Sequence, residues 1–393
     1  MDADTLVANA RATTGLECFG FDDFGLDDLG LDSCREGLDH YVEALEREAE
    51  LTELGELAIG AQITASLVNR LRVTDWLTQH PEARRAPVER PLVVLGLPRT
   101  GTTLLSELLH RDPANRSLMR WEASDCVPPP TASTFATDPR IDAARATGAA
   151  MDALNPEFKA IHYEAPDGPT ECVTLLAQDF KSLLWETIAN VPSYGDWLFG
   201  CDFTSAYEYH HGALSLLQSS APGRWALKTP QHSLALDALV AQYPDARLVM
   251  THRDPVTVVG SVCSLARVLS GTFSDADHGD SINTRWTAVA EEIVNRVMDW
   301  RDRHGDDRFV DVAYGDLIAD PVGTVGSIYG HFGEDLSAQA EASMRRYVDE
   351  HPRGEHGRHR YDVGALGLDR RELTARFAPY RERFGIPEEG SQR

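Results

Sequence analysis

The segment GLPRTGTT, residues 96–103, constrains the fold of this chain more than any other stretch. It follows the apolar run LVVLG (92–96), which is typical of a strand buried on both faces. It leads into TTLLSELLH, which has the pattern of a helix. A strand, a glycine-flanked turn and a helix in this order are the context of a phosphate-binding P-loop. Thr102 stands at the lysine position of that pattern, but the backbone N–H groups of such a turn bind an anion without a lysine.

Further apolar runs are each followed by a helical pattern: WALK (225–228), ARLVMTH (246–252) and RFVDVAY (308–314). Strands that alternate with helices indicate a parallel sheet covered on both faces, with ligands bound at the carboxyl ends of the strands. We therefore expect an α/β fold in which a P-loop-type parallel sheet is flanked by helices.

Two long segments lie outside this alternation. Residues 1–87 carry apolar side chains at helical spacing and predict a helical N-terminal extension to an α/β domain over 88–393. Residues 123–224 are too long for a simple crossover and predict a helical insertion that forms a lid or an acceptor pocket. Its aromatic rings suit either a helical core or the wall of that pocket. These rings are Phe158, Tyr163, Phe180, Trp185, Tyr194, Trp197, Phe199, Phe203, Tyr207 and Tyr209.

Charge and cysteine content exclude several classes of protein. The net charge of −25 argues against a nucleic-acid surface, so an anionic ligand must be held by a local basic pocket. The six cysteines form no C-x-x-C pair, which indicates neither a zinc site nor a disulfide framework, and we expect no metal. The first residues lack a basic region and no run of 18 apolar residues occurs, which predicts a cytoplasmic protein without membrane insertion.

A second anion site is predicted by HRDPVTVVGS, residues 252–261. Arg253 ends a strand, while Asp254 suits the N-cap and Pro255 the first position of the following helix. P-loop NTPases carry an acidic magnesium ligand at a comparable strand end. An arginine binds phosphate directly, and Ser261, two turns into the helix, could donate to the same group.

Two other segments place basic side chains where an anion could lie. Lys228 and His232 follow the WALK strand, and a lysine at a buried strand end is costly unless it meets an anion. The basic C-terminal loop HPRGEHGRHRYDVGALGL (351–368) could close over a ligand through Arg358. A solvated loop and, for His232, an ordinary polar residue at a helix start are the alternative interpretations.

Together these motifs resemble the sulfotransferases that use 3′-phosphoadenosine 5′-phosphosulfate (PAPS). GLPRTGTT is similar to their 5′-phosphosulfate loop, HRDPVTVVGS to their 3′-phosphate site and LKTPQH to the segment between the two. YGDLIADP (314–321) is similar to a later structural segment, with Gly315 in place of the usual glutamate. The segments WEA (121–123) and PPP (128–130) resemble signatures of a bacterial, actinobacterial-type branch with an N-terminal helical extension.

The resemblance implies in-line transfer of a sulfuryl group from PAPS to a hydroxyl of a small-molecule, lipid or glycan acceptor. Lys228 would act on the leaving-group oxygen, because preorganised cations stabilise the charge that develops there. The 5′-phosphosulfate would be held by Arg99, Thr100, Gly101, Thr102 and Thr103, and the 3′-phosphate by Arg253, Ser261 and Arg358.

Three side chains compete for the role of general base. Glu122 ranks first, because related families carry a catalytic glutamate at that place, and His232 and His162 follow. Glu171 is expected in the acceptor wall.

Two other functions suit parts of the pattern. A P-loop kinase or phosphotransferase would need Mg²⁺ and a lysine at the position of Thr102. A non-catalytic nucleotide-binding protein could use the same fold. The N-terminal helices also offer a surface for a homodimer.

Overall fold

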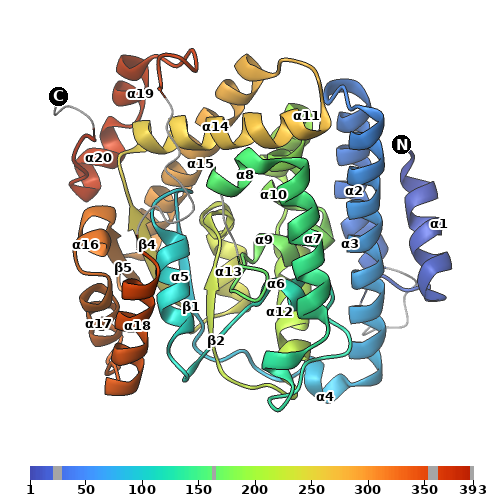
Figure 1. Ribbon diagram of the computed structural model, residues 1–393, viewed down its shortest axis with the longest axis horizontal. Coiled ribbons are helices and arrows are strands. Elements are labelled where there is room, and N and C mark those ends of the chain that lie inside the picture. Colours follow the sequence, from blue (N-terminus) through green and yellow to red (C-terminus); the bar gives the residue numbers. More distant parts are fainter. Residues whose placement is uncertain (21–28, 162–164, 353–361, 390–393) are drawn as a thin grey trace.

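The computed structural model describes residues 1–20, 29–161, 165–352 and 362–389 (Figure 1). Within them, five parallel strands form one sheet in the order β2-β3-β1-β4-β5. The strands are β1 Leu92–Gly96, β2 Asn115–Ser117, β3 Arg224–Lys228, β4 Arg247–His252 and β5 Phe309–Ala313. The parallel α/β fold is confirmed, and the expected strands agree to within one residue at each end. Only β2 was missed, because its sequence NRS has no apolar run.

The central position of β1 places the turn at residues 97–101 between two other strand ends. All five residues of β1 are buried, which explains the continuous apolar run LVVLG. Val94 pairs with Lys228 on β3, and Gly96 pairs with Thr251 on β4. The turn that follows β1 therefore lies between the segment after Lys228 and the segment after His252.

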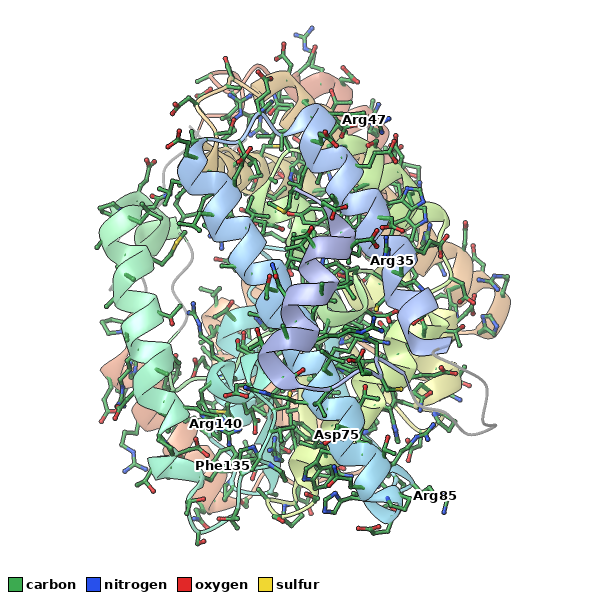
Figure 2. The ribbon with its side chains drawn as sticks, turned by 90° about the vertical axis from the view of Figure 1, so that its right-hand side faces the viewer. Arg35, Arg47, Asp75, Arg85, Phe135 and Arg140 are labelled. Atoms are coloured by element: carbon green, nitrogen blue, oxygen red, sulfur yellow. The ribbon has the colours of Figure 1, made fainter. Side chains whose placement is uncertain are left out.

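Helices of the N-terminal region pack on the rest of the molecule. They are α1 Ala3–Thr14, α2 Leu29–Glu48, α3 Glu53–Gln79 and α4 Pro81–Arg84. Leu67 and Leu71 of α3 belong to the same hydrophobic core as Val93 and Leu95 of β1. Figure 2 shows α1 on the outside, in front of α2 and α3. The division at residue 87 stays a prediction, because this core is continuous across it.

The segment between β2 and β3 is mostly helical. Its α-helices are α6 Arg120–Ser124, α7 Arg140–Leu154, α8 Pro156–Ile161, α9 Val173–Leu176, α10 Leu183–Ile188, α11 Pro192–Gly200 and α12 Thr204–Gln218. Phe180, Trp185, Tyr194, Tyr207 and Tyr209 from this segment are fully buried in the core. These rings therefore stabilise the fold.

Helices from the rest of the chain cover the sheet and its carboxyl edge. They are α5 Thr102–His110, α13 Leu236–Gln242, α14 Pro255–Phe273, α15 Gly279–His304, α16 Tyr314–Ala319, α17 Pro321–His331, α18 Ala338–Glu350, α19 Arg370–Arg376 and α20 Ala378–Phe384. Figure 1 shows α16, α17 and α18 on the flank opposite α2 and α3.

Helix α14 is unusually apolar. In the described part of the chain it alone has the length and composition to cross a membrane, with a mean hydropathy of 1.5 over its best window. Two thirds of that window (67%) is buried inside the protein, as expected of a core helix. The apolar composition of α14 is thus explained by packing within the fold.

Candidate active site

A cavity of about 780 Å³ lies at the carboxyl ends of β1, β3 and β4. Its polar side chains gather near the turn after β1, and its apolar side chains extend away along α14. The residues at the polar end include Arg99, Gly101, Thr102, Thr103, Arg120, Glu171, Thr229, Arg253 and Tyr314. The site therefore lies where ligands bind in open α/β sheets.

The turn after β1 has the backbone geometry of an anion cradle. Gly101 precedes α5 with φ +90°, and a Cβ there would lie 2.9 Å from the Leu317 side chain, so only glycine fits. Arg99 also adopts a left-handed conformation, with φ +65°. Thr102 and Thr103 begin α5 and line the cavity, so the positive end of that helix faces it.

Thr100 does not direct its hydroxyl into the cavity, contrary to the expectation for the 5′-phosphosulfate site. It is fully buried, its Oγ1 donates to the Leu97 carbonyl at 2.7 Å, and it lies 2.6 Å from Thr251 Oγ1. The hydroxyl therefore joins the turn to β4, because every buried polar group needs a partner.

The turn and the segment after β4 meet through two arginines. Arg99 Nε donates to Ser261 Oγ at 3.2 Å, and its Nη2 donates to the Ile161 carbonyl at 2.9 Å. Arg253 Nη1 in turn donates to the Arg99 carbonyl at 3.0 Å. The structure thus joins the two predicted anion sites into one cluster, in which Ser261 contacts Arg99.

Arg253 is also held by two residues that the sequence did not reveal. Its Nη2 and Nε donate to the Glu389 carboxylate at 2.8 and 2.9 Å. Its guanidinium carbon lies 4.2 Å from the centre of the Tyr314 ring, a cation–π contact. Tyr314 directly follows β5, so its place at this edge could have been inferred, whereas no pattern points to Glu389.

Lys228 forms the second polar contact of the site. The Lys228 side chain is 2% exposed, and its Nζ donates to Glu171 Oε1 at 2.8 Å. Thr229 Oγ1 donates to Glu171 Oε2 at 3.0 Å. Glu171 lines the cavity and Lys228 lies behind it. A buried cation and a carboxylate that faces the cavity are therefore within direct hydrogen-bond distance. The sequence had placed Glu171 only in the acceptor wall.

Glu122 lies in a different environment from the one expected of a general base. It is fully buried, and its two carboxylate oxygens accept from Arg116 at 2.9 and 2.8 Å. Its Oε1 also accepts from the Met119 backbone N–H at 3.0 Å. Glu122 does not line the cavity. Its bidentate pair with Arg116 joins the start of α6 to β2, which is a structural role.

His232 likewise belongs to the core. It is fully buried, its Nδ1 lies 2.7 Å from the Tyr207 hydroxyl, and burial lowers its pKa to about 3. Its neighbours Thr229, Pro230 and Gln231 line the cavity, but His232 does not. The imidazole is therefore neutral and separated from the place of reaction, which argues against it as the base.

Two predicted site residues lie outside the described residues. His162 precedes residue 165, and Arg358 falls between residues 352 and 362 of the basic C-terminal loop. Over the ranges that the structure describes, no three His, Cys, Asp or Glu side chains form a group that could hold a metal ion.

The apolar arm of the cavity follows one face of α14. Val262, Leu265, Leu269 and Phe273 recur at helical spacing and all line it. Helices α9, α10 and α15 supply the facing wall, with Val173, Leu183, Leu184, Ile188, Trp286, Val289 and Ile293. The described rings of residues 123–224 are absent from this wall. The arm is thus mostly aliphatic, with Phe273 and Trp286 as its rings, and it suits an apolar ligand.

Comparison with known proteins places this arrangement in context. Residues 91–338 match the model of the sulfotransferase family. The crystal structure of sulfotransferase STF9 from Mycobacterium avium superposes with a TM-score of 0.89 at 36% identity, covering 99% of this chain and 98% of that one. The crystal structure of sulfotransferase STF1 from Mycobacterium tuberculosis H37Rv superposes with a TM-score of 0.83 at 37% identity, covering 96% of this chain and 99% of that one.

A curated relative adds the name of an acceptor. The chain is 24% identical over 276 residues to omega-hydroxy-beta-dihydromenaquinone-9 sulfotransferase Stf3 of Mycobacterium bovis. The match covers 66% of this chain and 67% of that protein. Stf3 of Mycobacterium tuberculosis matches with the same identity and coverage.

Proposed function

The chain belongs to the sulfotransferase family, and from that premise we propose that it transfers a sulfuryl group from PAPS to the hydroxyl of an apolar alcohol. The observation that carries the proposal is the contact of Lys228 with Glu171 beside the anion cradle of residues 96–103. A cation for the leaving group and a carboxylate for the acceptor proton are thus supplied by adjacent side chains. The turn after β1 has no lysine, and Lys228 at the end of β3 supplies the cation instead.

Several observations support PAPS as the donor. The positive end of α5, the left-handed turn and Arg99 suit the 5′-phosphosulfate. Arg253 already holds an anion, because the Glu389 carboxylate accepts from it at two nitrogen atoms. Arginine offers the same paired donors to a phosphate. We assign Arg253 to the 3′-phosphate, with Ser261 acting through Arg99 and Arg358 as a further candidate outside the described residues.

The proposed chemistry divides between Glu171 and Lys228. PAPS supplies the sulfuryl group and a phosphate oxygen as leaving group. Glu171 accepts the proton of the acceptor hydroxyl while that oxygen bonds to sulfur and the bond from sulfur to the phosphate oxygen breaks. Lys228 stabilises the negative charge on the departing oxygen. In the structure the two side chains neutralise each other, so we propose that the donor draws Lys228 away and leaves Glu171 as a base.

The acceptor is proposed from the wall of the cavity. An apolar wall, aliphatic except for Phe273 and Trp286, favours an apolar chain that carries a hydroxyl, since burial of apolar surface is the main source of affinity there. The relative Stf3 is named for a lipid acceptor with a terminal hydroxyl, which supports the same class here. A glycan is less well supported, because most side chains of the apolar arm are aliphatic and offer a sugar no hydrogen-bond partner.

The cysteines bear on the cellular location of the protein. Cys34, Cys126, Cys172 and Cys263 are buried free thiols, which suits a reducing cytoplasm, and we propose that location. The N-terminal helices as a homodimer surface also stay a proposal.

Thermal stability separates this function from its alternatives. Because a ligand that binds only the native state stabilises it, 3′-phosphoadenosine 5′-phosphate should raise Tm, and ATP with Mg²⁺ should not. Arg253→Ala should abolish the rise. A larger rise with ATP and Mg²⁺ would favour a phosphotransferase. Radiolabelled sulfate transfer to a long-chain alcohol then tests for catalysis, and donor binding without transfer to any alcohol would favour a non-catalytic protein.

A further inference from the structure

Large apolar side chains are seldom exposed in this protein. Among the described residues they are Met1, Leu54, Leu57 and Leu154, with exposed fractions of 39%, 46%, 72% and 45%. Met1, Leu54 and Leu57 lie on or beside the first turns of α3, and Leu154 ends α7. We call these four residues the apolar rim.

The first side of the apolar rim is fixed to the end of α14. The Thr52 N–H donates to the Phe273 carbonyl at 2.9 Å, and a Cβ on Gly55 would lie 2.2 Å from that oxygen. Leu54 precedes Gly55 and Leu57 follows it in the first turns of α3. The Met1 side chain lies 3.5 Å from the Cβ position of Gly60, within the next turn.

The second side of the apolar rim reaches the same end of α14 from α7. The Asn155 amide donates to the Val268 carbonyl at 3.1 Å and to Thr272 Oγ1 at 2.6 Å. Leu154 immediately precedes it and is exposed. Figure 2 shows α7 and the first turns of α3 flanking one edge of the molecule. Leu54 and Leu154 are therefore each one residue from a contact with the C-terminal turn of α14, whereas Leu57 lies on the exposed face of α3.

The apolar rim continues into the interior of the protein. Gln62 of α3 and Met151 of α7 line the cavity close to the rim, and so does Phe273. The stripe from Val262 to Phe273 spans about 16 Å at 1.5 Å per residue. It begins beside Ser261, which contacts Arg99. The apolar wall thus leads from the sulfuryl-transfer end of the cavity to Phe273, the residue that Gly55 contacts next to Leu54.

We propose that the apolar rim docks this enzyme on the surface of a neutral lipid bilayer, from which the acceptor enters the cavity with its hydroxyl first. The proposal rests on the apolar acceptor of the proposed function, because such a molecule resides in lipid. The apolar rim adjoins the residues at the end of the acceptor path, which favours a bilayer over a protein partner. Leucines inserted at the interface contribute binding in proportion to the apolar area that they bury.

Charge narrows the class of lipid. Glu53 and Glu56 flank the exposed leucines on α3, and the whole chain carries a net charge of −25. Anionic headgroups repel such a surface, whereas zwitterionic headgroups do not. The occupant is therefore a bilayer of zwitterionic lipid, bound through apolar contact.

Vesicle cosedimentation tests the docking. The full chain should bind phosphatidylcholine vesicles and bind phosphatidylglycerol vesicles less well. The double variant Leu57→Gln/Leu154→Gln should lose about tenfold in partitioning per leucine that inserts. Leu57→Met/Leu154→Met keeps the apolar character and should bind as the unchanged chain does. No binding of the unchanged chain, equal binding of the glutamine variant, or binding only to phosphatidylglycerol would overturn the proposal.

Activity separates this proposal from the proposed function. On a short water-soluble alcohol the glutamine variant should match the unchanged enzyme. On a long-chain alcohol dissolved in phosphatidylcholine vesicles it should be slower by the same factor as its loss of vesicle binding. Equal rates on the vesicle-borne alcohol would overturn the docking. Vesicle binding that depends on the leucines, without transfer to either alcohol, would support the docking and contradict the proposed function.

Discussion

Arg253 and Glu389, which lie 136 residues apart, form a paired contact in which Nη2 and Nε of the arginine donate to the carboxylate at 2.8 and 2.9 Å. The Glu389 backbone N–H also donates to Asp254 Oδ2 at 3.0 Å, which fixes the tail beside the start of α14. The C-terminal tail thus holds a carboxylate against the arginine that we assign to the 3′-phosphate. Donor and tail are expected to compete for the same guanidinium.

Glu389→Gln should strengthen the binding of 3′-phosphoadenosine 5′-phosphate. The pair is partly exposed, with exposed fractions of 18% and 35%, so its removal should lower Kd by about two- to fivefold. Isothermal titration calorimetry measures the change. Glu388→Gln is the matched control, because Glu388 pairs with Arg381 and its loss should leave Kd unchanged. Weaker binding in Glu389→Gln would show that the carboxylate supports the donor site.

Glu171→Gln should lower kcat by about 10² to 10⁴-fold, the usual contribution of a general base. The amide is close in size to the carboxylate and can still accept a hydrogen bond from Thr229 or Lys228, so the cavity should keep its shape. Single-turnover sulfate transfer gives the rate, and calorimetry should show donor affinity within a few fold of the unchanged enzyme. An unaltered kcat would exclude Glu171 as the base.

Glu122→Gln should lower the free energy of unfolding and leave kcat unchanged. It removes the charge opposite Arg116, which is 5% exposed and cannot be solvated in place. Breaking such a buried pair costs about 3–5 kcal/mol of the free energy of unfolding. Urea unfolding measures this, and kcat per folded molecule is the control. Normal stability together with a large loss of kcat would restore Glu122 as the base.

Acid should destabilise the protein partly through His232. Burial lowers its pKa from 6.5 to about 3, so between these values the unfolded chain binds more protons than the folded one. The contribution of His232 to the free energy of unfolding is fully present above pH 6.5. Below that pH it falls by about 1.4 kcal/mol per pH unit. His232→Gln should therefore reduce the loss of stability between pH 7 and pH 5 by about 2 kcal/mol. Unfolding curves at several pH values measure this, and an unchanged pH dependence would show that His232 is protonated in the folded protein.

The sequence predicts the position of those candidate residues that stand at the ends of strands. Lys228 and Arg253 each come at the end of an apolar run, and parallel strands bring their carboxyl ends to one edge. Glu171 follows no strand, so only the folded chain shows that it contacts Lys228.

Three expected site residues direct their side chains away from the cavity for a common physical reason. A sequence motif places a residue near the carboxyl edge of the sheet but does not fix the direction of its side chain. Glu122 turns to Arg116 on β2, the strand without an apolar run, and His232 turns to Tyr207 on α12. Thr100 turns inward to Thr251. Tyr207 and Thr251 are distant from their partners in the sequence, and Arg116 lies on a strand with a weak sequence pattern. In each case the buried polar group takes the partner that satisfies it.

In the proposed assignment, helix α14 meets one substrate at its first turn and the other along its side. The first turn, from Asp254, lies beside Arg253, whereas Val262, Leu265, Leu269 and Phe273 line the proposed acceptor path. Exchange of these four apolar residues for others of similar total volume leaves the fold and the donor contacts in place. Enzymes that descend from this architecture can thus diverge in acceptor by changing one strip of a single helix while their donor chemistry is inherited unaltered.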